Sequence, residues 1–138
     1  MTSRRWFLVG IVVLVLAQTL VWLFAGSVWW TFRGGIVWPG QEPDPTRIAR
    51  DSFVAIAFYI AAAINVAVLL AFLARPGRRF TLLLAVIQTI DALAAVAFTL
   101  VIDKAWILIT ALAVPTLALL YLAERRRSTA TLQPIQPS

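Results

Sequence analysis

The chain has 138 residues, of which 62% are hydrophobic and 13% are charged. Soluble domains carry about 25% charged residues, so this composition excludes an ordinary soluble domain and indicates an integral membrane protein. The sequence contains no cysteine and no histidine, which excludes thiol nucleophiles, thiolate–zinc and iron–sulfur sites, histidine-ligated haem and serine–histidine triads. We therefore predict no cofactor and no metal site, and these exclusions favour a protein that is not an enzyme.

Four apolar runs predict four membrane-spanning helices. The runs cover residues 6–30, 52–74, 80–102 and 105–123, and each is close to the roughly 20 residues that a helix needs to cross a bilayer core. Backbone groups inside a bilayer must be hydrogen-bonded within the protein, and the runs lack the period-two alternation of a membrane β-barrel. The predicted fold class is therefore all-α, a single transmembrane four-helix domain.

The segments between and around the predicted helices set the topology. Very short connections at residues 75–79 and 103–104 predict antiparallel neighbours, whereas residues 31–50 form a long outer loop. The domain covers residues 1–127, and the polar tail of residues 128–138 is predicted to be disordered.

Arginine indicates the orientation of this predicted bundle. Eight arginines flank one side, whereas the other side carries three arginines and one lysine that acidic residues balance. By the positive-inside rule, both termini lie in the cytoplasm, and the chain is a multi-pass protein of a bacterial inner membrane. The eight arginines are Arg4, Arg5, Arg75, Arg78, Arg79, Arg125, Arg126 and Arg127.

Two arginines lie near the predicted start of the second helix. Asp44 or Thr46 is expected to cap a helix that begins near Arg47. Arg47 and Arg50 could bind lipid phosphate or the anionic head of a ligand. The alternative is a solvated ion pair with Asp51 or Asp44, and the sequence leaves both interpretations open.

Four polar side chains inside the predicted spans share one depth. Counted from the charge that bounds each helix on the cytoplasmic side, they lie about 13–20 Å deep, near the middle of a hydrocarbon core about 30 Å thick. Two of them are three residues apart in the third span and so project from one face of that helix. The four are Gln18, Asn65, Gln88 and Asp91.

Asp91 is the costliest residue of this layer. A carboxylate at mid-bilayer costs about 2.5–3.5 kcal/mol on insertion scales, and no basic side chain is expected at its depth. We therefore expect a neutral acid that donates to Gln18 or Asn65 and accepts from Gln88. Such a network could hold the helices together, or it could bind a small ligand or a proton. Catalysis is the third interpretation. The sequence argues against it, because no second titratable group is expected beside Asp91 to share the acid and base steps.

The layout resembles small bacterial four-helix membrane proteins of the DoxX-like kind. The features that carry the resemblance are a long first outer loop with prolines, Arg47 and Arg50 at the start of the second helix, a basic inner turn, and Gln88-x-x-Asp91 in the third helix. Some relatives are linked to quinone-dependent oxidation beside a partner subunit. The resemblance thus implies a redox-associated accessory role, and it assigns no catalytic residue here.

Two functions follow from these features. The first is an accessory or interaction subunit of a larger membrane complex, because the chain offers no cofactor ligands and no soluble domain. The second is a small-ligand or proton-coupled transporter or binding protein that uses Asp91. The predicted partners are the lipid bilayer and either other membrane subunits or a second copy of the chain. Nucleic acid is not among them, because orientation explains the net charge of +6.

Overall fold

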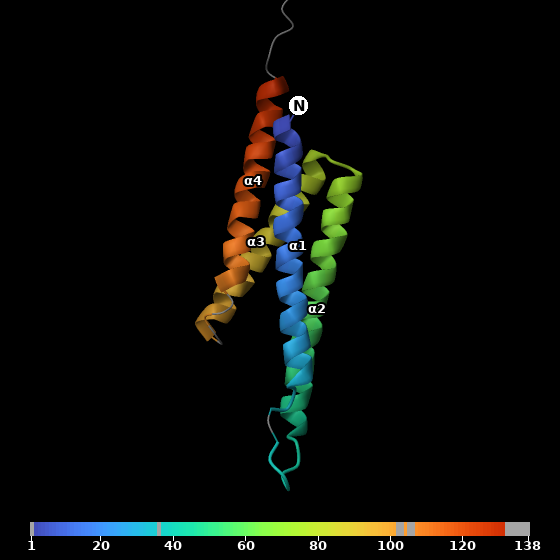
Figure 1. Ribbon diagram of the computed structural model, residues 1–138, viewed down its shortest axis with the longest axis vertical. Coiled ribbons are helices and arrows are strands. Elements are labelled where there is room, and N and C mark those ends of the chain that lie inside the picture. The colour runs from blue at the N-terminus through green and yellow to red at the C-terminus, as the bar shows by residue number, and fades with distance from the viewer. Residues whose placement is uncertain (1, 36, 102–103, 105–106, 132–138) are drawn as a thin grey trace, which may run out of the picture.

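The computed structural model describes residues 2–35, 37–101, 104 and 107–131, and it is a bundle of four α-helices (Figure 1). The helices are α1 (Thr2–Thr31), α2 (Pro45–Ala74), α3 (Arg78–Val101) and α4 (Ile107–Thr131). All four are long and apolar enough to cross a membrane. The predicted all-helical fold with four helices of membrane-spanning length is therefore confirmed.

Helix α2 begins earlier than the predicted span, which starts at residue 52. Asp44 is its N-cap, and the Asp44 side chain accepts a hydrogen bond from the Thr46 backbone N–H at 2.9 Å. Pro45 occupies the first turn, where its missing N–H and fixed φ suit a helix start. The expectation of a helix that begins near Arg47 is therefore confirmed to within two residues, and of the two cap candidates it is Asp44 that caps it. The first turns of α2 occupy the end of the predicted outer loop of residues 31–50.

Helix α4 continues beyond the predicted end of the fourth span at residue 123. It reaches Thr131, and Glu124 and Arg127, one turn apart, form an ion pair at 3.8 Å. The Ser128 and Thr129 hydroxyls donate to backbone carbonyls one turn earlier. Residues 128–131 of the predicted disordered tail are thus helical, and residues 132–138 lie outside the described residues.

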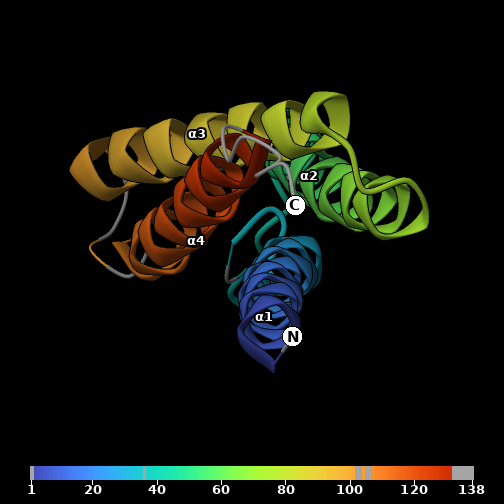
Figure 2. The same cartoon turned by 90° about the horizontal axis from the view of Figure 1, so that it is seen from above.

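The four helices form a ring. α1 packs against α2 and α4, and α3 packs against the same two helices, with α1 and α3 on opposite sides (Figure 2). Among the described residues, no Cα atom of α1 lies within 8 Å of a Cα atom of α3. The most extensive contact joins α1 to α2, and the second most extensive joins α3 to α4. The bundle is therefore two helical pairs packed on each other.

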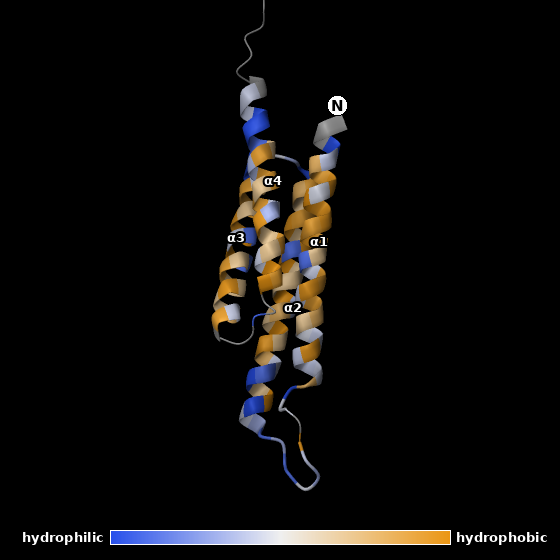
Figure 3. Cartoon of the chain, turned by 60° about the vertical axis from the view of Figure 1, so that its left-hand side comes forward, coloured by the Kyte–Doolittle hydropathy of each residue, from blue (hydrophilic) through white to orange (hydrophobic). Residues whose placement is uncertain are grey.

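The two ends of the bundle differ in character. The start of α1, the connection between α2 and α3, and the end of α4 lie together at what we call the terminal end (Figure 1). The segment between α1 and α2 lies at the opposite end, the loop end. Hydrophilic residues are concentrated at both ends, and a few more lie midway along otherwise apolar helices (Figure 3).

Each helix buries only a narrow stripe of side chains. In α1 the stripe runs through Ile11, Val15, Gln18 and Trp22, with the spacing of three or four residues that keeps one helix face inward. Large apolar side chains elsewhere stay exposed, and the most exposed is Leu100 at 82%. An apolar exterior is the surface expected of a bundle that lipid surrounds.

Candidate functional site

The buried polar layer lies between two apolar clusters. The cluster nearer the terminal end includes Ile11, Val15, Val68, Leu69, Phe72, Leu84 and Leu120. The cluster nearer the loop end includes Trp22, Phe58, Ala62, Ala95 and Ile109. The four predicted polar residues fall between these groups along α1, α2 and α3, and all four are buried. The structure therefore brings together the four polar side chains for which the sequence predicts a common depth in the membrane.

Asp91 is the acceptor on which the layer converges. Its Oδ2 atom accepts from Asn65 Nδ2 at 2.6 Å and from Gln18 Nε2 at 2.7 Å. The indole N–H of Trp22 points at the same oxygen from 3.4 Å. One carboxyl oxygen of α3 thus binds donors from both α1 and α2, including the helix across the ring.

The prediction that Gln88 bonds directly to Asp91 is wrong. Gln88 Nε2 donates instead to Asn65 Oδ1 at 2.8 Å. Asn65 in turn donates from Nδ2 to Asp91 and to the Ala61 carbonyl. Its short side chain can accept from one residue of α3 and donate to another because both face α2, one turn apart. The described hydrogen bonds therefore run from Gln88 through Asn65 to Asp91, and Asp91 donates none of them.

Two amide oxygens of the layer lack a donor. Gln18 Oε1 and Gln88 Oε1 are buried and have no hydrogen-bond partner in the described part of the chain, and both glutamines are 0% exposed. An unpaired buried acceptor costs about 1–3 kcal/mol. The donors of the layer thus converge on Asp91, whereas two amide oxygens beside it accept no hydrogen bond from the described residues.

Sequence reasoning missed Trp22 as a member of the layer. Trp22 follows Gln18 by four residues and so shares its helix face, which is a signal that the sequence did contain. Thr89, at a similar depth to Gln88 in α3, is exposed and donates to its own helix at the Ala85 carbonyl. Among these neighbours it is therefore Trp22 that extends the polar layer.

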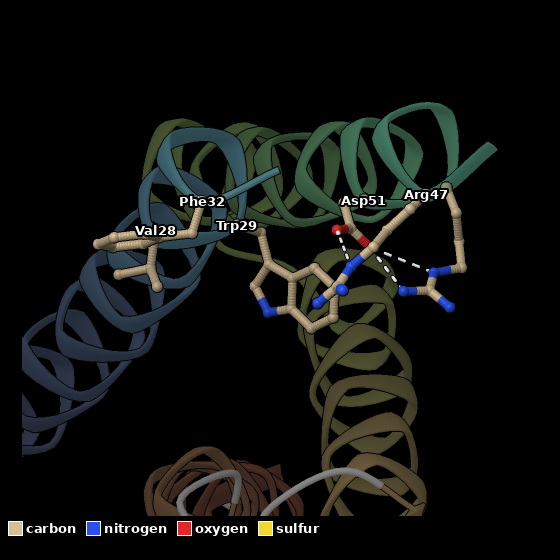
Figure 4. Close-up of a pocket in the computed structure, with 6 residues that line it drawn as sticks. Val28, Trp29, Phe32, Arg47 and Asp51 are labelled. Atoms are coloured by element: carbon tan, nitrogen blue, oxygen red, sulfur yellow. Dashed lines mark hydrogen bonds and ion pairs between the residues drawn. The ribbon is translucent and has the colours of Figure 1, made fainter. Parts of the chain in front are cut away.

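A second group of polar residues lies at the loop end. Asp51 is only 4% exposed, and its Oδ2 accepts from the Gly34 backbone N–H at 3.1 Å. Its Oδ1 accepts from both Nε and Nη2 of Arg50, at 3.2 and 3.1 Å. Arg47 Nε lies 3.8 Å from Asp51 Oδ2 (Figure 4). Asp51 therefore ties the turn that follows α1 to α2 and holds Arg50 through two hydrogen bonds.

Glycine makes this link between the loop and α2 feasible. Gly34 and Gly35 have φ values of +84° and +80°, a backbone conformation that residues with a Cβ atom rarely adopt. A Cβ at Gly34 would lie 2.7 Å from Ile48, and one at Gly35 would lie 2.7 Å from Arg47 Cζ. The turn thus packs its bare backbone against the first turns of α2.

The two groups are separate sites. Asp51 lies fourteen residues before Asn65 on α2, which is about 21 Å along a helix axis. Arg47 and Arg50, predicted as anion-binding candidates, therefore lie near the loop end and away from Asp91. In the described residues no group of three or more acidic side chains is arranged to hold a metal ion.

No known protein family, curated protein or solved structure matches the chain. The similarity to DoxX-like proteins therefore stays a prediction.

Proposed function

We propose that the protein is an accessory or interaction subunit of a larger membrane complex. In this proposal it is an antiparallel bundle in a bacterial inner membrane, with both termini in the cytoplasm. The distribution of arginine supports that orientation, because Arg5, Arg75 and Arg125 all belong to segments at the terminal end (Figure 1). A DoxX-like accessory role beside a redox partner is one form of this proposal.

The outward face of α2 carries the proposal. Ala63 and Ala67 are exposed and lie one turn apart, two residues before and after the buried Asn65, so they face away from the bundle. Small residues at this spacing let a second helix approach closely, which is how helices associate in lipid. Ile60 and Leu70, both exposed, flank the pair. This face is suited to pack against a helix of another subunit.

The polar layer is consistent with this role as a structural network. Its hydrogen bonds join both helical pairs, from Gln18 and Asn65 to Asp91 and from Gln88 to Asn65. Such bonds contribute about 0.6–2 kcal/mol each in membrane proteins. A bundle fixed internally in this way can present a constant outer surface to a partner.

The test is extraction from the native host into discs of its own lipid, followed by mass measurement and identification of every chain that co-purifies. We expect a stoichiometric set of other membrane subunits. Ala63→Phe should release them, because the larger ring blocks close approach, and Leu93→Phe on the exposed face of α3 is the matched control. A lone monomer or homodimer would contradict the proposal.

The unpaired amide oxygens favour a second candidate function, a small-ligand or proton-coupled transporter or binding protein. Gln18 Oε1 and Gln88 Oε1 lack donors beside the carboxyl group of Asp91. A proton on Asp91, or an N–H or O–H group of a small ligand, would supply a donor in this position.

Infrared spectroscopy tests this second candidate. We expect a C=O stretching band of a protonated carboxyl group that disappears in Asp91→Asn and shifts when pH or a bound ligand changes. The same variant should abolish transport or ligand binding while the bundle stays folded. A band that never shifts, with unaltered function in Asp91→Asn, would leave the layer a structural network only.

A further inference from the structure

The loop end holds an amphiphilic pocket that neither proposed function uses. The pocket has a volume of about 220 Å³, and it is lined by the last turn of α1, by Phe32 directly after it and by the start of α2 (Figure 4). A second pocket of about 240 Å³, lined in part by Asp44 and Thr46, shares both of its arginines. The residues that line the first pocket are Val28, Trp29, Phe32, Arg47, Arg50 and Asp51.

The α1 side of the pocket is apolar, and the α2 side is basic. Val28 of α1 and Phe32, the first residue after α1, are exposed, Phe32 by 64%. On α2, two guanidinium groups accompany the single carboxylate of Asp51, so this lining carries one net positive charge. The pocket thus combines an apolar surface with a neighbouring net positive charge.

Arg47 is the side chain that is able to bind an added anion. Asp51 already occupies Arg50 through two hydrogen bonds, whereas Arg47 approaches Asp51 only through Nε at 3.8 Å. The Arg47 side chain is 54% exposed, and its guanidinium lies against Gly35, where a Cβ atom would collide with it. Its two terminal nitrogens keep a planar fork that fits a phosphate or carboxylate group.

The depth of the pocket matches the boundary between hydrocarbon and headgroups. With Gln18 and Asn65 near the middle of the bilayer, Val28 lies about 15 Å from the middle and Arg47 about 27 Å, measured along the helices. The hydrocarbon core ends about 15 Å from the middle, and the headgroup region about 20–22 Å from it. At a tilt of about 20° the two distances become about 14 and 25 Å, and Arg50 lies about 21 Å from the middle. The apolar wall therefore lies beside the end of the core and Arg50 among the headgroups, whereas the backbone of Arg47 lies about 3 Å outside them, a distance that its long side chain can span.

We propose that this pocket binds the phosphate headgroup of an anionic lipid in the leaflet at the loop end. Arg47 binds the phosphate, and Val28, Trp29 and Phe32 contact the first carbons of the acyl chains. The apolar half of the lining favours a lipid over a free anion, because free phosphate would leave that wall without a partner.

Lipid binding to the purified, delipidated protein tests the proposal. Native mass spectrometry would compare phosphatidylglycerol with phosphatidylcholine of the same chains, with inorganic phosphate as competitor. We expect preferential binding of phosphatidylglycerol, a loss of about tenfold in affinity for Arg47→Gln, and partial recovery in Arg47→Lys. Arg33→Gln is the matched control, because Arg33 stacks over Trp30 at 4.4 Å and does not line the pocket.

Phe32→Ser provides a second variant on a highly exposed position that should fold normally. It should weaken binding of phosphatidylglycerol without creating binding of free phosphate. Equal binding of both lipids, or an Arg47→Gln variant that binds phosphatidylglycerol as the wild type does, would overturn the proposal. Full competition by inorganic phosphate would also overturn it, since the ligand would then be a soluble anion. None of these outcomes depends on a partner subunit or on Asp91.

Discussion

Replacing Asp91 with leucine should destabilise the bundle by about 1–3 kcal/mol. Asp91 Oδ2 accepts two short hydrogen bonds, of 2.6 Å from Asn65 and 2.7 Å from Gln18. Hydrogen bonds between membrane helices contribute about 0.6–1.7 kcal/mol each, which gives the stated range for two of them. The Trp22 contact at 3.4 Å is at the edge of hydrogen-bonding geometry and adds little.

Asp91→Asn should behave differently from Asp91→Leu. The amide keeps one oxygen that accepts from Asn65 or Gln18, and its own N–H adds a donor to a layer in which two amide oxygens lack one. We therefore expect a change in unfolding free energy within about 0.5 kcal/mol. Thr89→Leu is the control on the same helix, because Thr89 is exposed and bonds only to its own turn.

The assay is reversible unfolding in lipid bicelles, where both the folded and the unfolded helices stay in the membrane. That reference state keeps the cost of inserting a carboxyl group out of the comparison. If Asp91→Leu is as stable as the Thr89→Leu control, the convergence of donors on one oxygen contributes no stability and the reasoning fails. If Asp91→Asn costs as much as Asp91→Leu, the layer requires the acid itself.

Three further predictions concern the loop end and the apolar core. Gly34→Ala should cost about 2–3 kcal/mol in the same unfolding assay, because it combines a positive φ with a Cβ that would lie 2.7 Å from Ile48. Gly40→Ala, which has a positive φ but open space around it, should cost about 1 kcal/mol. Equal costs for the two variants would show that the contact with Ile48 is unimportant. Asp51→Ala should remove the hydrogen bond to the Gly34 N–H, so hydrogen exchange of that amide should accelerate, and an unchanged rate would contradict the contact. Phe58→Ala should cost about 3 kcal/mol, because the Phe58 ring lies 5.3–6.4 Å from three other aromatic rings; a cost below 1 kcal/mol by the same unfolding measurement would mean that the cluster repacks.

The shared depth of the polar layer could be predicted from the sequence. The rise of about 1.5 Å per residue fixes how far each residue lies from the charges that end its span, and this placed Gln18 and Asp91 at one level. The presence of four helices followed in the same way, because the length of an apolar run is a direct physical requirement of the bilayer.

The partners within the layer could not be predicted as reliably. To choose between Asp91 and Asn65 as the partner of Gln88, one must know how each helix is rotated about its own axis. Hydropathy does not reveal that rotation in a membrane bundle, because nearly every face of α2 and α3 is apolar. The polar start of α2 could be predicted from its cap, Asp44, but the polar extension of α4 to Thr131 was missed. Apolar content marks the part of a helix inside the bilayer, whereas the extension of α4 is polar and carries contacts such as the Glu124–Arg127 ion pair.

The pairing of helices has a consequence for biosynthesis. Every hydrogen bond that reaches Asp91 or leaves Gln88 in the described layer joins α3 to a residue of α1 or α2. The first two helices leave the ribosome before the third, so Gln18 and Asn65 are already in the membrane when Asp91 arrives. Insertion of α3 is the step that carries the carboxyl group of Asp91 into lipid. Hydrogen-bond donors of α1 and α2 lower the free-energy cost of this step as α3 and α4 pack against them. A ribosome-bound chain that lacks Gln18 and Asn65 should therefore integrate its third segment less efficiently.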